Sequence, residues 1–170
     1  MPLPDRPVDA ADIETAWGQA VHDWTFAPVG CDLDTATTRT VDNTAGGLQC
    51  HLDTVNNDPA GFLDAPNDQA VVPAGMDGLY LLNSRLNSVN GSVGDGFQTR
   101  QLIYLNGSAI ASSVEDNAGG TNIVVTVTAL VALSALDELQ VFAQRKGAGT
   151  NPTVHVLSFQ LLRLGSDYGA

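Results

Sequence analysis

Apolar and polar residues alternate along several short segments of this chain, a pattern typical of β-strands with one buried face. The clearest segment is 123–133, where apolar residues from Ile123 to Val131 share one face and Thr126 and Thr128 lie on the other. Such spacing between strands is typical of an all-β sandwich or barrel. The predicted strands span residues 79–89, 97–105, 109–114, 123–133, 139–145 and 154–164.

Turn-forming residues separate these segments. Asn90-Gly91 and Asn106-Gly107 are dipeptides that readily adopt the positive φ angles of tight β-hairpins. Residues 31–70 are turn-rich and acidic, with shorter extended pieces at 38–41 and 48–55. The pattern therefore predicts antiparallel strands joined by short loops.

The last predicted strand departs from simple alternation, because its apolar residues fall on both faces. They are Leu157, Phe159 and Leu161 on one face, and Val154, Val156 and Leu162 on the other. An antiparallel strand with one solvated face should alternate instead. Two buried faces are expected either of a central core strand or of a strand that also contacts neighbouring subunits in a trimer.

Near the N-terminus, residues 10–24 follow a helical pattern instead. Prolines within residues 1–8 predict an extended arm. Asp9 is a suitable helix N-cap, and Pro28 and Gly30 end the helical pattern. An isolated helix of this length is marginal in water, so its apolar stripe must be covered by the sandwich, by further copies in a three-fold bundle, or by a docking partner. The stripe consists of Ile13, Trp17, Val21 and Trp24.

Charge excludes some classes of partner. The 170 residues carry 7 Lys+Arg against 19 Asp+Glu, a formal net charge of −12, which disfavours binding to nucleic acids and to anionic membranes. The N-terminus lacks the apolar run of a signal peptide, and no segment reaches the ~20 apolar residues of a membrane span. We expect no membrane insertion.

Side chains that could carry chemistry are few and scattered. The histidines show no zinc-type spacing, and the serines lack the context of a hydrolase nucleophile, so structural roles are the better interpretation. The two cysteines are expected to be buried thiols, with a single disulfide as the alternative. These residues are His22, His51, His155, Cys31 and Cys50.

The acidic loops raise the question of calcium. Carboxylates in residues 31–70 could supply the oxygen ligands of a Ca²⁺ site, but no EF-hand-like loop is present. Solvated turn residues are the better interpretation, and we expect no cofactor, with Ca²⁺ as the one weak alternative. The candidate ligands are Asp53, Asp58, Asp64 and Asp68, with Asp32 and Asp34 nearby.

A series of motifs in a fixed order resembles a known family. A Pro- and Gly-containing entry leads into a strand from Pro73 to Tyr80, and Asn106-Gly107 forms a hairpin tip. Residues 133–144 follow the pattern L-x-x-x-D-x-L-x-V-x-x-Q, and 158–162 read S-F-x-L-L. Together they resemble the trimeric jelly roll of complement globular heads and tumour-necrosis factors, and in particular the versions on bacteriophage fibres and virion appendages. The glycine expected before Asp137 is absent.

This resemblance covers roughly residues 46–164 and implies an all-β antiparallel jelly-roll sandwich, homotrimeric, preceded by a short N-terminal α-helix. Together with the helical pattern near the N-terminus, it predicts residues 1–30 as the attachment arm and helix, 31–45 as a linker, 46–166 as the jelly-roll domain and 167–170 as a tail. Apolar faces that pack in the trimer or the core are expected at Tyr80, Tyr104, Phe142 and Phe159.

The function that the resemblance implies is assembly and binding rather than catalysis. Arg6-Pro7-Val8 and Val21-His22-Asp23 are similar to openings of small virion proteins of tailed phages. We therefore expect a virion protein made in a bacterial cytoplasm: a trimeric tail or tail-tip appendage that binds itself, other virion proteins and a host-surface glycan or protein. The alternatives are a capsid decoration protein, a carbohydrate-binding module, an enzyme built on a jelly roll, or a secreted module. Residues 89–96, 115–122 and 146–151 are the loops expected to touch the host.

Overall fold

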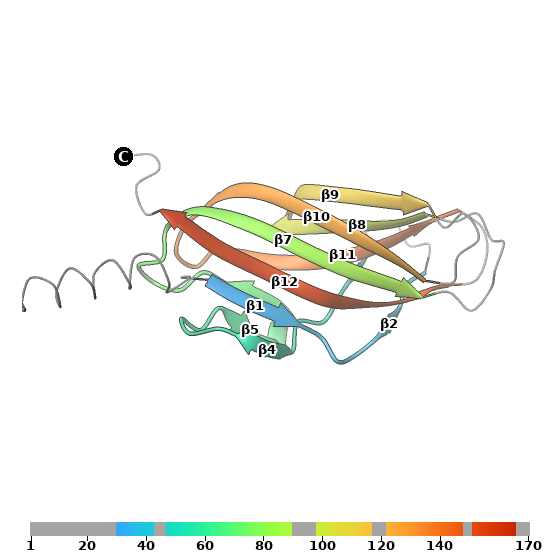
Figure 1. The fold of residues 1–170 in the computed structure, drawn as a ribbon, viewed down its shortest axis with the longest axis horizontal. Helices are drawn as coiled ribbons and strands as arrows, with labels where there is room; N and C mark the ends of the chain where they lie inside the picture. Colours follow the sequence, from blue (N-terminus) through green and yellow to red (C-terminus); the bar gives the residue numbers. More distant parts are fainter. Residues whose placement is uncertain (1–29, 43–46, 90–97, 117–121, 148–150, 166–170) are drawn as a thin grey trace, which may run out of the picture.

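The chain forms two antiparallel β-sheets that pack face to face, as Figure 1 shows. The computed structural model describes residues 30–42, 47–89, 98–116, 122–147 and 151–165. The first sheet contains, in spatial order, β10 (Asn122–Leu133), β7 (Gly78–Val89), β12 (Thr153–Gly165), β1 (Gly30–Asp34) and β4 (Thr54–Asn57), and β2 (Arg39–Thr40) also pairs with β12.

The second sheet lies across the core from the first. Its spatial order is β5 (Leu63–Asp64), β6 (Gln69–Val71), β11 (Glu138–Lys146), β8 (Gln98–Leu105) and β9 (Ser108–Asp116), with β3 (Leu48–Gln49) also paired with β11. A short 3₁₀ turn, η1 (Ala65–Asn67), joins β5 to β6.

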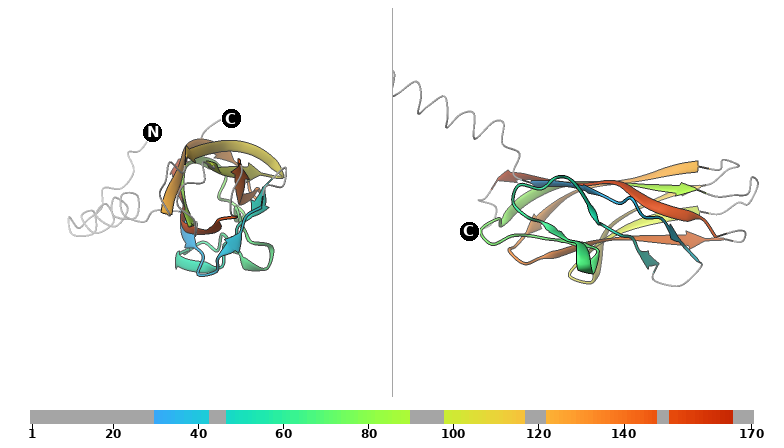
Figure 2. Two further views of the ribbon diagram at one scale, coloured as in Figure 1. Left: turned by 90° about the vertical axis from the view of Figure 1, so that its right-hand side faces the viewer. Right: turned by 90° about the horizontal axis from the view of Figure 1, so that it is seen from below.

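The chain crosses repeatedly from one sheet to the other. β7 belongs to the first sheet, β8 and β9 form a hairpin in the second, and β10 returns to pair with β7. Figure 2 shows the two layers end-on and from below. The predicted all-β antiparallel jelly-roll sandwich is confirmed. Among the described residues, no helix is long and apolar enough to cross a membrane.

The six long predicted strands are confirmed, because β7 to β12 match them within a few residues at each end. In β10, Val125, Val127 and Leu133 are buried in the core, as the alternation predicts. The two cysteines are free and buried.

The structure differs from the expected linker at residues 31–45. Strand β1 begins at Gly30 and pairs with β12, so the sandwich starts before residue 46. Cys31 and Leu33 are buried in the core. Gly30 permits this pairing, since a Cβ there would lie 1.8 Å from the carbonyl oxygen of Leu161. With only two apolar side chains facing inward, a strand this short leaves little signal in the sequence.

The structure also corrects the prediction that the last strand has two buried faces. The register of β12 on β7 shifts between Val156 and Ser158, so Leu157 is an extra residue in a β-bulge. An extra residue inverts the alternation that follows it. As a result the core contains Val154, Val156, Phe159 and Leu161 together. The apolar pattern of this strand therefore gives no evidence for a second buried face in a trimer.

Polar side chains join the two sheets inside the sandwich. The Gln101 amide on β8 donates to Ser84 Oγ on β7 at 2.6 Å. Ser88 Oγ and Thr99 Oγ1 lie 2.9 Å apart across the same layers. All four residues are buried, so the core of this molecule is apolar in part and hydrogen-bonded in part.

The predicted attachment helix and its stripe, Ile13, Trp17, Val21 and Trp24, lie outside the described residues. The same holds for most of the three predicted contact loops. Their described neighbours are the strand ends at Val89, Asp116 and Lys146.

Candidate interaction surfaces

The outward-facing side chains of the first sheet form rows that cross β10, β7 and β12. The register places Leu130 beside Leu81, and Leu81 beside Leu162. Leu130 exposes 64% of its surface and Leu162 38%, and Leu164 on the same strand exposes 50%. We call Leu81, Leu130, Leu162 and Leu164 the leucine patch. Contiguous exposed apolar side chains of this kind mark contact sites more often than scattered ones do.

The next row of the same face is polar and internally satisfied. Asn83 donates to Thr128 Oγ1 at 3.0 Å, and Gln160 donates to Asp32 Oδ2 at 3.2 Å. Since these groups already bond to each other, the row offers less to a partner than the leucines do. The part of the face best suited to contact a partner is therefore its end near Gly30, where β1 begins (Figure 1).

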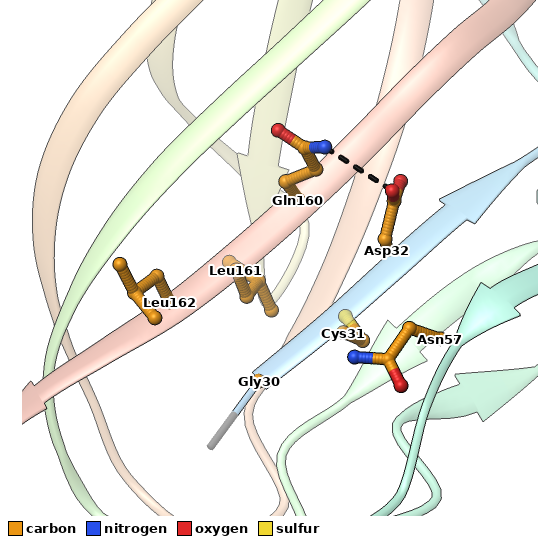
Figure 3. Close-up of a pocket in the computed structure, with 7 residues that line it drawn as sticks. All are labelled: Gly30, Cys31, Asp32, Asn57, Gln160, Leu161 and Leu162. Atoms are coloured by element: carbon orange, nitrogen blue, oxygen red, sulfur yellow. Dashed lines mark hydrogen bonds between the residues drawn. The ribbon is translucent and has the colours of Figure 1, made fainter. Parts of the chain in front are cut away.

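A shallow pocket of about 190 Å³ borders the leucine patch (Figure 3). Asn57 and Gln160 stand on either side of β1, and Leu162 forms its apolar margin. Asp32 Oδ1 is enclosed without a hydrogen-bond partner in the structure. The pocket therefore combines amide groups, a carboxylate and an apolar rim at the same end of the face as the patch.

The thiol that lines this pocket is not a nucleophile. Burial raises the pKa of Cys31 well above its ordinary value, and the nearby charge of Asp58 raises it further. Burial likewise raises the pKa of Cys50 to about 12. Because thiolates and not thiols react, neither cysteine is activated for catalysis.

His51 belongs to a structural network. The Arg39 Nε–H donates to His51 Nε2 at 2.8 Å, and His51 Nδ1 lies 2.6 Å from Asp68 Oδ1. Both ring nitrogens are thus engaged, and neither is available as a general base for a substrate. His155 lies on β12 with its Nδ1 enclosed, and His22 lies outside the described residues.

Two of the acidic residues considered as calcium ligands instead accept hydrogen bonds from residues close to them in the sequence. Asp58 accepts hydrogen bonds from the amides of Phe62 and Leu63 at 2.7 and 2.8 Å. Asp64 accepts from the side chains of Asn67 and Gln69. Within the described ranges no three His, Cys, Asp or Glu side chains are grouped as metal ligands would be.

Asp53 is a further acceptor at the edge of the first sheet. Burial raises its pKa slightly, but hydrogen bonds from Thr35, Thr54, Thr37 and the Ala36 amide outweigh this and hold the pKa below its ordinary value. The carboxylate thereby links the segment after β1 to β4.

The four aromatic residues predicted for a trimer or core face lie in two places. Tyr80 and Phe159 are fully buried in the core, and the Tyr80 hydroxyl donates to the Met76 carbonyl. Burial raises the pKa of Tyr80. Tyr104 and Phe142 instead lie on the outer face of the second sheet, half-buried, with ring centroids 4.4 Å apart.

The leucine patch was not found from the sequence. Leu130 follows Thr128 and precedes Ala132 on the face that alternation assigns to solvent, and an apolar residue at such a position is the available signal. Leu81 carries no such signal, since its exposure depends on the register of β7 between two neighbours.

Solved structures similar to this chain have the same fold. The globular domain of zebrafish complement 1qA protein matches with a TM-score of 0.61 and 11% identity over 82% of this chain and 99% of that one. The Eiger TNF of S. frugiperda matches with a TM-score of 0.56 and 9% identity over 84% and 96% of the two chains. No family model matches the chain, and no curated protein matches its sequence. At these identities the similarity establishes the fold alone.

Proposed function

We propose that this chain is a non-enzymatic structural protein of a bacteriophage virion, a trimeric tail or tail-tip appendage whose jelly roll assembles with itself and contacts the host surface. The observation that carries the self-assembly is the leucine patch on the outer face of the first sheet. The sequence motifs and the N-terminal opening described above support the virion assignment, and the fold is compatible with it.

The outer face of the first sheet would supply most of the area of a stable contact. β7 has 12 residues, and at about 3.4 Å per residue it is roughly 40 Å long. Three strands at about 4.8 Å spacing make the face ~15 Å wide, or ~600 Å² in plan. Stable interfaces bury roughly 800 Å² on each partner, so this face would supply about three quarters of that area and contacts at its rim the rest.

Most of the binding free energy of such a contact would come from the leucine patch. Fully burying one leucine side chain contributes about 1.5–3 kcal/mol relative to leaving it exposed. Leu130 and Leu164 retain half or more of their exposed surface in the single chain, so both have much to gain. The hydrogen-bonded row that follows would set orientation more than affinity.

The proposal also assigns the two ends of the molecule. The described chain enters the sandwich at Gly30, at the end that carries the leucine patch. Residues 1–30 would fix this end to the virion. The opposite end, where β7, β9 and β11 finish, would then face outward toward the host.

Native mass by light scattering tests the trimer. We expect a mass near three times 17.7 kDa for the whole chain. Leu130→Asp should raise the trimer dissociation constant at least roughly tenfold, since it places a charge in an apolar contact. Ile110→Asp, at a residue that is 40% exposed on β9, is the matched control and should leave the mass unchanged.

A monomer at micromolar concentration, or a trimer that tolerates Leu130→Asp, would refute the proposed assembly. Deleting residues 1–29 separates attachment from assembly. The shortened chain should still form trimers but should no longer be incorporated into virions. Incorporation into heads rather than tails would favour a capsid decoration protein.

A further inference from the structure

A second hollow lies on the outer face of the second sheet, at the end away from the leucine patch. It has a volume of about 160 Å³ and is formed by three adjacent strands. The register places Arg100 on β8 between Gln144 on β11 and Val114 on β9. Lys146, Gln98 and Ser112 complete it. We call these six residues the basic groove.

The groove concentrates positive charge on an acidic protein. The chain has 7 basic residues and a formal charge of −12, yet Arg100 and Lys146 stand diagonally across neighbouring strands. Diagonal neighbours in a sheet are about 7–8 Å apart. Among the described residues neither cation forms an ion pair. Two like charges held this close attract an anion between them.

The Arg100 guanidinium is held in place with donors to spare. Its Nη2 donates to Ser112 Oγ at 3.1 Å. Its Nε–H is enclosed and has no hydrogen-bond partner in the structure. Guanidinium groups offer planar pairs of N–H donors that match a carboxylate, and an enclosed donor without a partner is costly. A bound carboxylate would supply the missing acceptor.

Two further groups of the groove suit hydroxyls, and an aromatic pair lies beside it. The side-chain amides of Gln98 and Gln144 each offer donors and acceptors, as hydroxyl groups require. Two residues before Gln144 on the same face of β11, Phe142 stacks against Tyr104. Ligand sites typically combine such apolar surface with a few polar groups that fix orientation.

Asp116 is the carboxylate that could oppose an anion here. It is paired with Gln98 on the side away from Lys146. Two inter-strand spacings, about 10 Å, separate the backbones of Asp116 and Lys146. Asp116 is, like Lys146, a diagonal neighbour of Arg100, so its charge partly opposes an anion at Arg100. Its side chain does not line the groove, so a ligand carboxylate meets Arg100 and Lys146 from the groove itself.

We propose that the basic groove binds a carboxylated sugar, with the carboxylate on Arg100 and Lys146 and the hydroxyls on Gln98 and Gln144. The inference rests on the proposed function, because it names the ligand class through which a virion appendage would contact a host surface. The groove lies at the end assigned to that contact.

Saturation-transfer NMR on the whole chain tests the groove, with glucuronate as the probe and glucose as its neutral counterpart at equal ionic strength. We expect glucuronate to bind at least roughly tenfold more tightly than glucose, because the charge-assisted contact is missing from the latter. Arg100→Gln and Lys146→Gln should each weaken glucuronate roughly tenfold. Lys146 is exposed, so its substitution does not endanger the fold.

Arg85→Gln is the matched control, since it removes one exposed arginine from the opposite sheet and should change nothing. Equal binding of both sugars, or equal losses in Arg85→Gln and Arg100→Gln, would overturn the proposal. Sulfate displacing glucuronate at equal concentration would reduce the groove to a general anion site and overturn the sugar assignment. If the chain assembles into virions but binds no sugar, this inference alone is wrong. If the chain binds glucuronate but does not enter virions, only the proposed function is wrong.

Discussion

The outer faces of the two sheets differ in chemistry although they share one core. The first presents exposed leucines near Gly30 and a hydrogen-bonded polar row beyond them. The second presents Arg100 and Lys146 near the opposite end, beside a stacked aromatic pair. A sandwich leaves both outer faces free of the packing constraints of the core, so each can carry its own binding chemistry while the inner faces hold the fold.

The largest effect is expected from Phe159→Ala on β12. Phe159 is fully buried because the extra residue Leu157 restores its inward direction after Val156. Truncating a buried phenylalanine costs about 3–5 kcal/mol. We expect that loss in the free energy of unfolding, measured by denaturant titration.

Leu157→Ala is the control, because it truncates the half-buried inserted residue itself and keeps the bulge. It should cost less than half as much as Phe159→Ala. Equal losses in the two variants would contradict the account of β12 as a strand whose inward residues after Val156 are set by one inserted residue.

A smaller effect is expected from uncoupling the two sheets. Ser84→Ala leaves the buried Gln101 amide of β8 without its acceptor on β7. An unsatisfied buried donor costs about 1–3 kcal/mol. Thermal or denaturant unfolding measures this, with Ser108→Ala on the exposed end of β9 as the control. If both variants were equally stable, the hydrogen bond would not join the sheets energetically.

The smallest effect is expected at the edge of the first sheet, where the Asp53 carboxylate contributes to the stability of the fold. The pKa of Asp53 is lower in the folded chain than its ordinary value of 3.8. The carboxylate therefore adds stability above that value, and the contribution is lost as the pH falls through the folded pKa. Asp53 is exposed, so we expect less than about 1 kcal/mol.

The urea midpoint of the wild-type chain should fall as the pH drops below about 4, and Asp53→Asn should make that fall smaller. Asp116→Asn, on the second sheet, serves as the control and should not reproduce the change. A wild-type midpoint that is no more acid-sensitive than that of Asp53→Asn would remove the assigned role of Asp53.

The fold was predictable from the sequence where the alternation is long and regular. Strand β10 shows a clear period of two, so its position and inward face follow from the residues. The bulge at Leu157 was not predictable. In the sequence, one inserted residue makes the apolar residues that follow it appear to lie on the opposite face of the strand, although they face the same core. β1 is too short to show a period.

The candidate surfaces were less predictable because pairing between distant segments creates them. Arg100 and Lys146 are neighbours only through the register of β8 on β11. Leu81 and Leu162 meet in the same way through β7 and β12. Of the aromatic residues singled out by the motifs, Tyr104 and Phe142 lie beside the basic groove and Tyr80 and Phe159 in the core, a division that sequence periodicity alone does not make.

The position of β1 has a mechanical consequence. Its residues run antiparallel to β12 from the point where the chain enters at Gly30, and they point toward the far end of the sandwich. A pull between the entry point and a ligand held at that far end would act along the strands. The hydrogen bonds between β1 and β12 would then be loaded together in shear rather than opened one after another, and bonds loaded together resist a larger force than bonds opened in sequence.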